Sequence, residues 1–226
     1  MKLLAHISDD KTRTQTIEEH LTSTAALAGN FAAAFGAQAE AAYTALLHDI
    51  GKYSAGFQQR LQGGPPVDHS TAGAKAAIQD GNIPAALAIA GHHSGIPDLG
   101  NPHDTADEST LVGRSKRRIE DCSQWKQEIS PAKAALPPWL LRQPDNLTMA
   151  FFTRMLYSSL VDADFIDTET FMDGKAAPRG MGEPLPALLE KVRAQAKRYL
   201  DSPAASPVAQ ERNKVLRACM EQGTHA

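Results

Sequence analysis

The sequence predicts an all-α fold in which metal-binding side chains lie near the ends of several helices. Two patterns support this prediction: apolar residues recur at three-and-four spacing in several segments, and turn-forming residues separate those segments. No segment shows sustained apolar–polar alternation with β-branched enrichment, and no internal repeat is visible. With 226 residues, of which 42% are hydrophobic, the chain is long enough for one sizeable core, or for one core and an appendage.

The first half of the chain contains a series of short helical segments. In the first of them Ile17, Leu21, Ala28 and Phe31 form one apolar stripe, and His20 falls inside that stripe. Asp68, after a Gly- and Pro-rich turn, is placed to cap the fourth helix, and a proline opens the fifth. We therefore expect helices over residues 16–35, 38–49, 54–61, 69–79 and 84–92.

The second half is less regular. Residues 94–109 are rich in helix breakers and predict a long loop, residues 110–129 predict a charged helix facing solvent, and residues 147–165 predict a central helix buried on most sides. Residues 185–200 form an amphipathic pattern, residues 202–207 have the composition of a linker, and residues 208–221 predict a last short helix. We expect one domain over residues 1–201, followed by a linker and a short helix over residues 202–226.

Charge and composition limit the class of function. A formal charge of -3 argues against a protein that holds nucleic acid by overall basicity, so a polyanionic substrate must be gripped locally or with the help of a partner. Cys122 and Cys219 are far apart and form no disulfide framework. The first residues are too polar for a signal peptide, and no apolar run has transmembrane length. We expect a cytoplasmic protein without a membrane partner.

An ordered series of histidines and aspartates carries the chemical prediction. His48 and Asp49 are adjacent, and a histidine next to a carboxylate can share a metal centre. Each residue alone has an ordinary interpretation as a core or surface side chain, but their joint order beside helix ends is hard to attribute to chance. Imidazole and carboxylate together suit Mn, Fe, Co, Ni or Zn, and a carboxylate can bridge two ions. The series consists of His20, His48, Asp49, His69, His92, His93 and the pair Asp162 and Asp164.

Other charged and histidine residues have simpler interpretations. Lys52 has an ordinary surface interpretation and Gly51 an ordinary helix-capping one. His6, His103 and His225 lie near the termini or in the predicted loop, so we interpret them as structural or exposed.

Three strings give a narrower match. The residues from Gly51 to Leu61 (GKYSAGFQQRL), from Asp68 to Ala74 (DHSTAGA) and from Gly91 to Asp98 (GHHSGIPD) resemble the HD nuclease domain of the CRISPR-associated type I nuclease-helicase, a member of the HD superfamily of metal-dependent phosphohydrolases. The resemblance spans roughly residues 4–169. It resumes at residues 213–219, which look like the segment before the first helicase motif, most closely in subtype C members.

The resemblance implies an HD-domain helical bundle with one or two divalent cations, among which Mn, Co, Ni or Fe are favoured and Mg is possible. His20, His48, Asp49 and a late aspartate resemble a first metal site, and His69, His92 and His93, with Asp49 shared, resemble a second. Aligning Ala163-Asp164-Phe165 with the family's Ala-Asp-aromatic string selects Asp164, whereas Asp162 would point to another face of the same helix. Asp49 and Lys52 are the implied catalytic residues, and Lys52 would donate to a phosphoryl oxygen.

The implied activity is metal-dependent cleavage of single-stranded DNA, by endonuclease or exonuclease action, in type I CRISPR interference. No phosphate-loop motif Gly-x-x-x-x-Gly-Lys-Ser/Thr occurs in the sequence, so we expect a helicase in the same or a companion chain, and the CRISPR surveillance complex as a further partner. Two alternatives remain open: an HD phosphohydrolase acting on nucleotides, and a non-catalytic docking module stabilised by metal.

Overall fold

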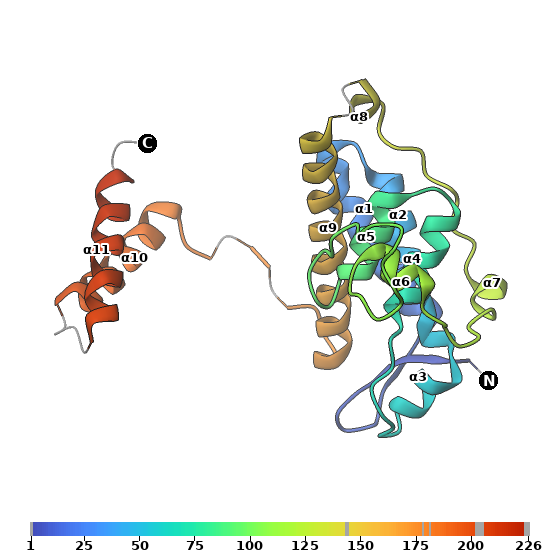
Figure 1. Ribbon diagram of the computed structural model, residues 1–226. Helices are drawn as coiled ribbons and strands as arrows, with labels where there is room; N and C mark the ends of the chain where they lie inside the picture. Colours follow the sequence, from blue (N-terminus) through green and yellow to red (C-terminus); the bar gives the residue numbers. More distant parts are fainter. Residues whose placement is uncertain (1, 143–144, 178, 181, 202–205, 224–226) are drawn as a thin grey trace. The chain divides into compact units, whose positions relative to one another are not determined.

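The computed structural model of the chain describes residues 2–142, 145–177, 179–180, 182–201 and 206–223 (Figure 1). Its residues group into two compact units, Met1–Ala177 and Pro178–Ala226. Described elements are overwhelmingly helical, which confirms the all-α fold class. The predicted domain boundary at residue 201 stays a prediction.

The first unit begins with a short β-hairpin that the sequence patterns did not predict. Strand β1 (Leu4–Ile7) pairs antiparallel with β2 (Thr14–Thr16), with His6 opposite Gln15. Thr16 then caps the first helix: its hydroxyl accepts from Glu19 N, and the Glu19 carboxylate accepts from Thr16 N. The hairpin is therefore fixed to the start of α1, next to the helix stripe that contains His20.

The core of the first unit is built from helices α1 (Ile17–Ala32), α2 (Gln38–Leu47), α4 (Ser70–Gln79), α5 (Ile83–Gly91) and α9 (Asn146–Asp173). In Figure 1 α9 runs alongside α1 and α5, and these helices pack against one another. Many of the buried side chains are alanines, which allow helix axes to approach closely, while Phe152, Leu156 and Leu160 of α9 supply bulk. Each of these large side chains contributes about 1.5–3 kcal/mol by its burial.

The second half of this unit departs from the sequence prediction. The charged helix expected over residues 110–129 is wrong: only α6 (Leu111–Lys116) and α7 (Trp125–Glu128) form. The chain turns extended at Arg117, whose carbonyl accepts from Lys75 Nζ of α4 at 2.8 Å. A short helix α8 (Pro138–Arg142) forms in a stretch for which no helix was predicted. Helix α9 is longer than predicted and is not buried on most sides, since Leu147, Phe151 and Phe165 are exposed.

The second unit contains helices α10 (Leu185–Asp201) and α11 (Pro207–Gln222), which pack against each other. Ser206 caps α11 by accepting from Ala209 N. The predicted linker over residues 202–207 lies mostly outside the described residues. Along the described part of the chain, no helix is long and apolar enough to cross a membrane.

Candidate metal centre

The seven histidines and aspartates predicted as ligands come together from five parts of the first unit. His20 lies in the middle of α1, and Asp164 lies in α9. His48 and Asp49 follow the end of α2 and precede the 3₁₀ helix η2 (Ile50–Tyr53). The remaining three lie at helix ends as predicted: His69 starts α4, and His92 and His93 follow the end of α5.

Two glycines allow these segments to meet. A side chain at Gly51 would collide with the backbone of His69, and a side chain at Gly73 would collide with the Leu47 carbonyl. The first contact brings the start of α4 against η2, and the second brings α4 against the end of α2. Gly51 therefore does not serve as the helix stop predicted from the sequence; its role is to let His69 approach Asp49.

The first group of side chains consists of His20, His48, Asp49 and Asp164, whose inward atoms all lie within 4.8 Å of one another. His20 Nε2 is 3.3 Å from both Asp49 Oδ2 and Asp164 Oδ1. His48 Nε2 is 3.3 Å from Asp49 Oδ2 and 3.6 Å from Asp164 Oδ1. Ligands about 2.1 Å from one ion are separated by roughly 3.0–3.4 Å, so this group has suitable spacing for a cation.

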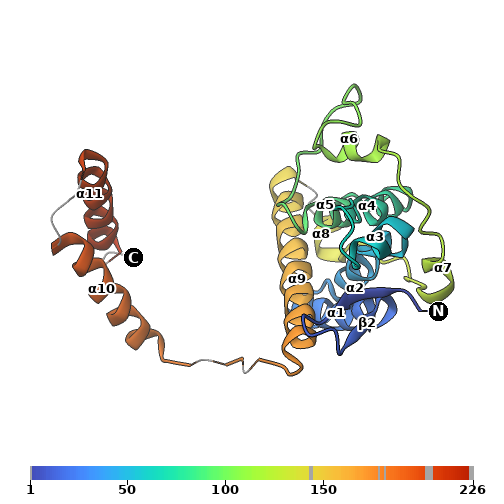
Figure 2. The ribbon, with the colours of Figure 1, turned by 90° about the horizontal axis from the view of Figure 1, so that it is seen from below.

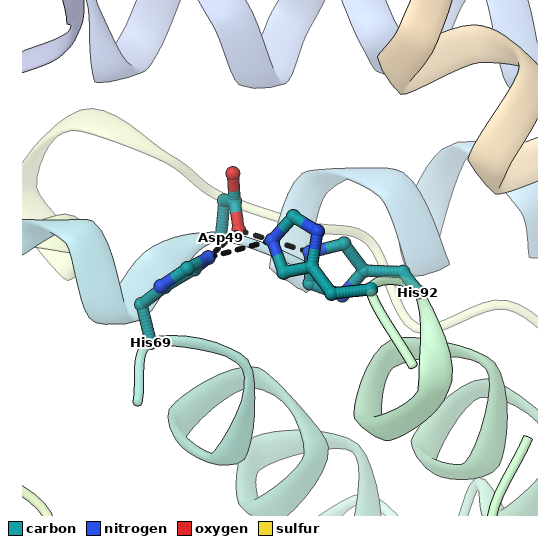
Figure 3. Close-up of side chains that lie close together, drawn as sticks. Asp49, His69 and His92 are labelled. Atoms are coloured by element: carbon teal, nitrogen blue, oxygen red, sulfur yellow. Dashed lines mark hydrogen bonds and ion pairs between the residues drawn. The ribbon is translucent and has the colours of Figure 1, made fainter. Parts of the chain in front are cut away.

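The second group consists of Asp49, His69, His92 and His93 and satisfies the same 4.8 Å limit. Figure 3 shows Asp49 pointing toward the rings of His69 and His92, whose Nε2 atoms are 3.5 and 3.3 Å from Asp49 Oδ1. His93 Nε2 lies 2.8 Å from His69 Nε2, a distance that requires a proton or a cation between the two nitrogens. His93 is the exposed member of this group, so the cluster reaches solvent on its side.

Asp49 belongs to both groups, and each of its oxygens faces a different one. Oδ2 faces the first group and Oδ1 the second, while the carboxylate itself is only 1% exposed. Oδ1 of Asp49 and Nε2 of His20, His48 and His92 are buried without a hydrogen-bond partner among the described residues, while Oδ2 is paired with the Lys52 ammonium at 2.7 Å. Unsatisfied buried polar atoms cost about 1–3 kcal/mol each. Four of them facing one another fit a site built for cations.

Hydrogen bonds at the other ring nitrogens fix the orientation of the imidazoles. Nδ1 of His48 lies 2.7 Å from Ala45 O, and Nδ1 of His92 lies 2.8 Å from Ile89 O. Nδ1 of His69 lies 3.1 Å from Val67 O. A carbonyl oxygen can only accept, so Nδ1 carries a proton in each ring. Nε2 points into the cluster, where it can bind a cation once it is deprotonated.

The two groups have different electrostatic environments. Burial lowers the pKa of His48, but Asp49 and Asp164 outweigh it and raise that pKa to about 10. Burial, followed by electrostatic repulsion from the neighbouring His92, lowers the pKa of His93 to about 4. Burial also favours protonation of Asp49, but His48 and Lys52 hold its pKa well below the usual range. The carboxylate is therefore ionised, as a metal ligand must be.

Lys52 is buried and not on the surface as its ordinary interpretation suggested. Its Nζ forms an ion pair with Asp49 Oδ2 at 2.7 Å and donates to His6 Nε2 at 3.0 Å. His6, interpreted from the sequence as structural or exposed, is therefore half-buried beside the centre, and its ring packs against that of His20. An ammonium can only donate, so His6 Nδ1 carries a proton and donates to Gln15 Oε1 at 2.8 Å.

The hydrogen bond between His6 and Gln15 belongs to a chain of hydrogen bonds that reaches His20. Gln15 and Asp167 connect the two histidines, and the sequence patterns suggested neither residue. Gln15 Nε2 donates to Asp167 Oδ2 at 2.9 Å, and the same oxygen accepts from His20 Nδ1 at 2.7 Å. The hairpin thus orients a ring of the first group and the Lys52 ammonium together. A signal for Asp167 was present: it lies three residues after Asp164, a spacing that places both on one side of a helix.

The structure separates the two late aspartates. Asp164 Oδ1 faces His20 and His48, whereas Asp162 is exposed on another face of α9. Among the other histidines, His103 is exposed, and His225 lies outside the described residues.

Comparison with known proteins agrees with this geometry. The HD domain family model matches residues 17–124, a range that contains every member of the cluster except Asp164. No curated protein matches the chain. The match to the HD domain family over residues 17–124, together with the histidine–aspartate cluster, points to a metal-dependent phosphohydrolase.

Proposed function

We propose that this chain is a nuclease domain that hydrolyses phosphodiester bonds of single-stranded DNA in type I CRISPR interference. The observation that carries the hydrolytic part is Asp49, which presents one oxygen to each of two potential ligand groups. The choice of single-stranded DNA rests on the three strings around Gly51, His69 and His92, which resemble the nuclease of type I systems.

In this proposal His20, His48, Asp49 and Asp164 hold one divalent cation, and Asp49, His69, His92 and His93 hold a second. Their mixture of nitrogen and oxygen donors favours Mn, Co, Ni or Fe over Mg, which prefers oxygen. When bound, such cations lower the pKa of a water molecule and neutralise charge on the phosphate.

The remaining roles fall to protein side chains. The Lys52 ammonium has three N–H groups; one points to Asp49 and one to His6, which leaves one to donate to a phosphoryl oxygen or to the departing oxygen. His6 and Gln15 hold that ammonium in place from the hairpin. Fixed donors of this kind stabilise developing charge without having to reorganise.

Access to the centre favours a flexible substrate. His20, His48 and His92 are buried and His93 is exposed, so a phosphodiester must approach from the His93 side. A single strand can bend toward a recessed centre, whereas an intact duplex is stiffer and wider. The net charge of -3 supports a helicase and the CRISPR surveillance complex as partners, because they would supply the backbone grip that this chain lacks.

The proposal is tested by removing metal with a chelator and adding back Mn, Co, Ni or Mg, with end-labelled single strands, blunt duplexes and mononucleotides as substrates. We expect cleavage of single strands, restored best by a transition metal, and poor cleavage of duplex. Efficient cutting of closed duplex would contradict the choice of substrate. Hydrolysis of mononucleotides alone would instead identify a nucleotide phosphohydrolase, and bound metal without any hydrolysis would identify a docking module.

A further inference from the structure

A cavity of about 350 Å³ opens beside the exposed edge of the metal centre. His69 and His93 of the second ligand group form part of its wall, and Arg60 and Arg114 form another part. Ser94 and Arg114 also line a second cavity of about 470 Å³, which the loop after His93 borders. Arg114 thus stands where the two cavities adjoin, next to the solvent-facing side of the cluster. We refer to the first of these as the Arg114 cavity.

Not all N–H donors of Arg114 have a hydrogen-bond partner within the described residues. It lies half-buried in α6, and one of its guanidinium nitrogens, Nη1, donates to Ser70 Oγ at a long 3.3 Å. Its Nε is buried and has no partner among the described residues. A guanidinium has five N–H donors and stays charged, so this side chain offers a planar, partly desolvated fork.

The backbone holds Arg114 firmly. Helix α6 packs against α4 and α5 through the buried side chain of Leu111. Leu111 N donates to Asp98 O at 2.9 Å, and Val112 N donates to Leu99 O at 3.0 Å, which ties the helix to the preceding loop. In Figure 2 this loop and α6 lie at the top of the first unit, above α4 and α5. The arginine therefore sits on a rigid support, which reduces the entropy lost on binding.

The charges around the Arg114 cavity favour an anion. Arg60, near the end of α3 (Ala55–Arg60), is exposed, and its side chain makes no hydrogen bond or ion pair within the described residues. Asp68 is an acidic member of the wall, but Arg117 Nη1 lies 3.2 Å from its Oδ2 and Thr71 Oγ1 donates to the same oxygen at 2.7 Å. Asp68 therefore interacts with Arg117, which does not line this cavity, as well as with Arg114. The two arginines of the wall still exceed its one carboxylate in charge.

We propose that the Arg114 cavity binds the phosphate next to the scissile phosphodiester of a single-stranded nucleic acid. The proposal rests on the function proposed above and adds a place where the strand is held. Arginine forks match phosphate oxygens in two-point hydrogen bonds. The volume lies at the small end for ligand cavities, so it suits one nucleotide unit and not an oligomer. The adjoining cavity provides the direction in which the strand continues past Arg114.

The test measures binding without turnover. Full-length wild type, Arg60→Ala, Arg114→Ala and Arg114→Lys are kept metal-free with a chelator and titrated against a fluorescent single-stranded oligonucleotide at several salt concentrations. We expect each alanine variant to bind about tenfold more weakly, as for the loss of one charged hydrogen-bonded contact. The slope of log K against log salt should fall by about 0.7 per arginine removed.

Arg154→Ala is the matched control, because Arg154 is an exposed arginine of α9 whose Nη1 donates to Ala150 O of its own helix. It should bind as wild type does, with an unchanged salt slope. Circular dichroism and metal content after loading report on the fold of each variant. Arg114→Lys, which keeps charge but loses the fork, should bind between wild type and alanine. If Arg114→Ala is misfolded, Arg60→Ala carries the test, since Arg60 is exposed.

The outcomes separate the two levels of the proposal. If metal-loaded wild type cleaves single strands but Arg60→Ala and Arg114→Ala bind them like wild type, the cavity is not the subsite, and the proposed function stands. If metal-loaded wild type hydrolyses only a small diester such as bis-p-nitrophenyl phosphate and binds no single strand, the substrate and the subsite are both overturned. A higher KM for oligonucleotide in the folded arginine variants would support the subsite.

Discussion

Two buried aspartates in the first unit, Asp104 and Asp49, differ in the partners that surround their carboxylates. Asp104, in the loop before α6, is 6% exposed; its Oδ2 accepts from Thr110 Oγ1 at 2.6 Å and from Asn101 N at 3.2 Å, and its Oδ1 accepts from Asn101 Nδ2. Asp49 is 1% exposed, and its Oδ1 accepts no hydrogen bond from the described residues. It faces four imidazoles and one ammonium instead.

The difference teaches that burial of a carboxylate does not by itself identify a functional site. Asp104 is satisfied by neighbours within a few residues, so it stabilises a loop. Within the described residues Asp49 has only Lys52 as such a partner, and the imidazoles around it are oriented by hydrogen bonds at their far ring nitrogens. A set of buried ligand atoms that are held in orientation but have no hydrogen-bond partner indicates a cation site. The following experiments test whether Asp49 belongs to such a site and Asp104 does not.

The largest effect is expected from Asp49→Ala. It should lose bound metal and nearly all hydrolysis together, because Asp49 contributes an oxygen to each ligand group. Lys52→Ala should lose about 10²–10³ in kcat, as for the removal of one positioned donor, while keeping metal content near wild type. Removing the positive charge 2.7 Å from Asp49 does not weaken the attraction for a cation.

Elemental analysis of both purified variants checks this division of roles. Equal loss of bound metal in Asp49→Ala and Lys52→Ala would mean that Lys52 supports the ligands and not the substrate.

The next effect separates Asp164 from Asp162. Asp164→Asn should remove one cation and most turnover, because Asp164 Oδ1 faces His20 and His48. Asp162→Asn makes the same chemical change two residues away on an exposed face, so it should retain most activity and all metal. Metal content per chain and single-strand cleavage are measured for both. A reversed result would place Asp162 in the first ligand group.

Metal should also stabilise the fold through the Asp49 cluster alone. A ligand at about 100 times its Kd adds roughly 2.7 kcal/mol of stability, which for a domain of this size raises Tm by about 5–10 °C. We expect Mn to raise the Tm of wild type and of Asp104→Ala by similar amounts, although Asp104→Ala starts lower in both conditions. Asp49→Ala should show little shift. If Mn raises the Tm of Asp49→Ala as much as that of wild type, Asp49 does not bind the stabilising cation, and the contrast with Asp104 fails.

Much of the cluster followed from sequence because its chemistry lies in a few residue types at helix ends. The three-and-four pattern around His20 and the order of His48, His69 and His92 placed the predicted ligands on elements that do meet. The resemblance to a nuclease family selected Asp164, which the structure places in the cluster. The ligand roles themselves stay predictions until metal is measured.

The supporting residues could not be predicted in this way, because their roles depend on contacts between distant segments. His6 belongs to a strand too short for a periodic pattern, and only its pairing with Gln15 brings it to Lys52. The segment around Arg114 appeared to be a solvent-facing helix because its charges are dense. A contact with a distant helix overrode that local pattern, since the helix ends at Arg117, whose carbonyl accepts from Lys75 of α4.

The smallest predicted effect concerns a third buried carboxylate, Glu40 of α2, which lies between the two extremes. Its Oε1 accepts from Asn82 Nδ2 at 2.6 Å, but its Oε2 is buried without a partner. Burial raises the pKa of Glu40, and the Asn82 bond only partly opposes this. The folded state therefore binds a proton more tightly than the unfolded state, so ionised Glu40 costs stability as pH rises above about 4.5.

Glu40→Gln removes that charge while keeping an oxygen for Asn82. Relative to wild type, its Tm should be nearly unchanged near pH 4 and should rise by about 2–4 °C at pH 7, an effect on the order of 1 kcal/mol. Asp9→Asn, at an exposed carboxylate, should show no such trend between the two pH values. Thermal unfolding of metal-free protein measures both. If the difference in Tm between Glu40→Gln and wild type is the same at all pH values, ionised Glu40 does not destabilise the fold. A buried carboxylate oxygen without a partner would then not by itself indicate a cation site.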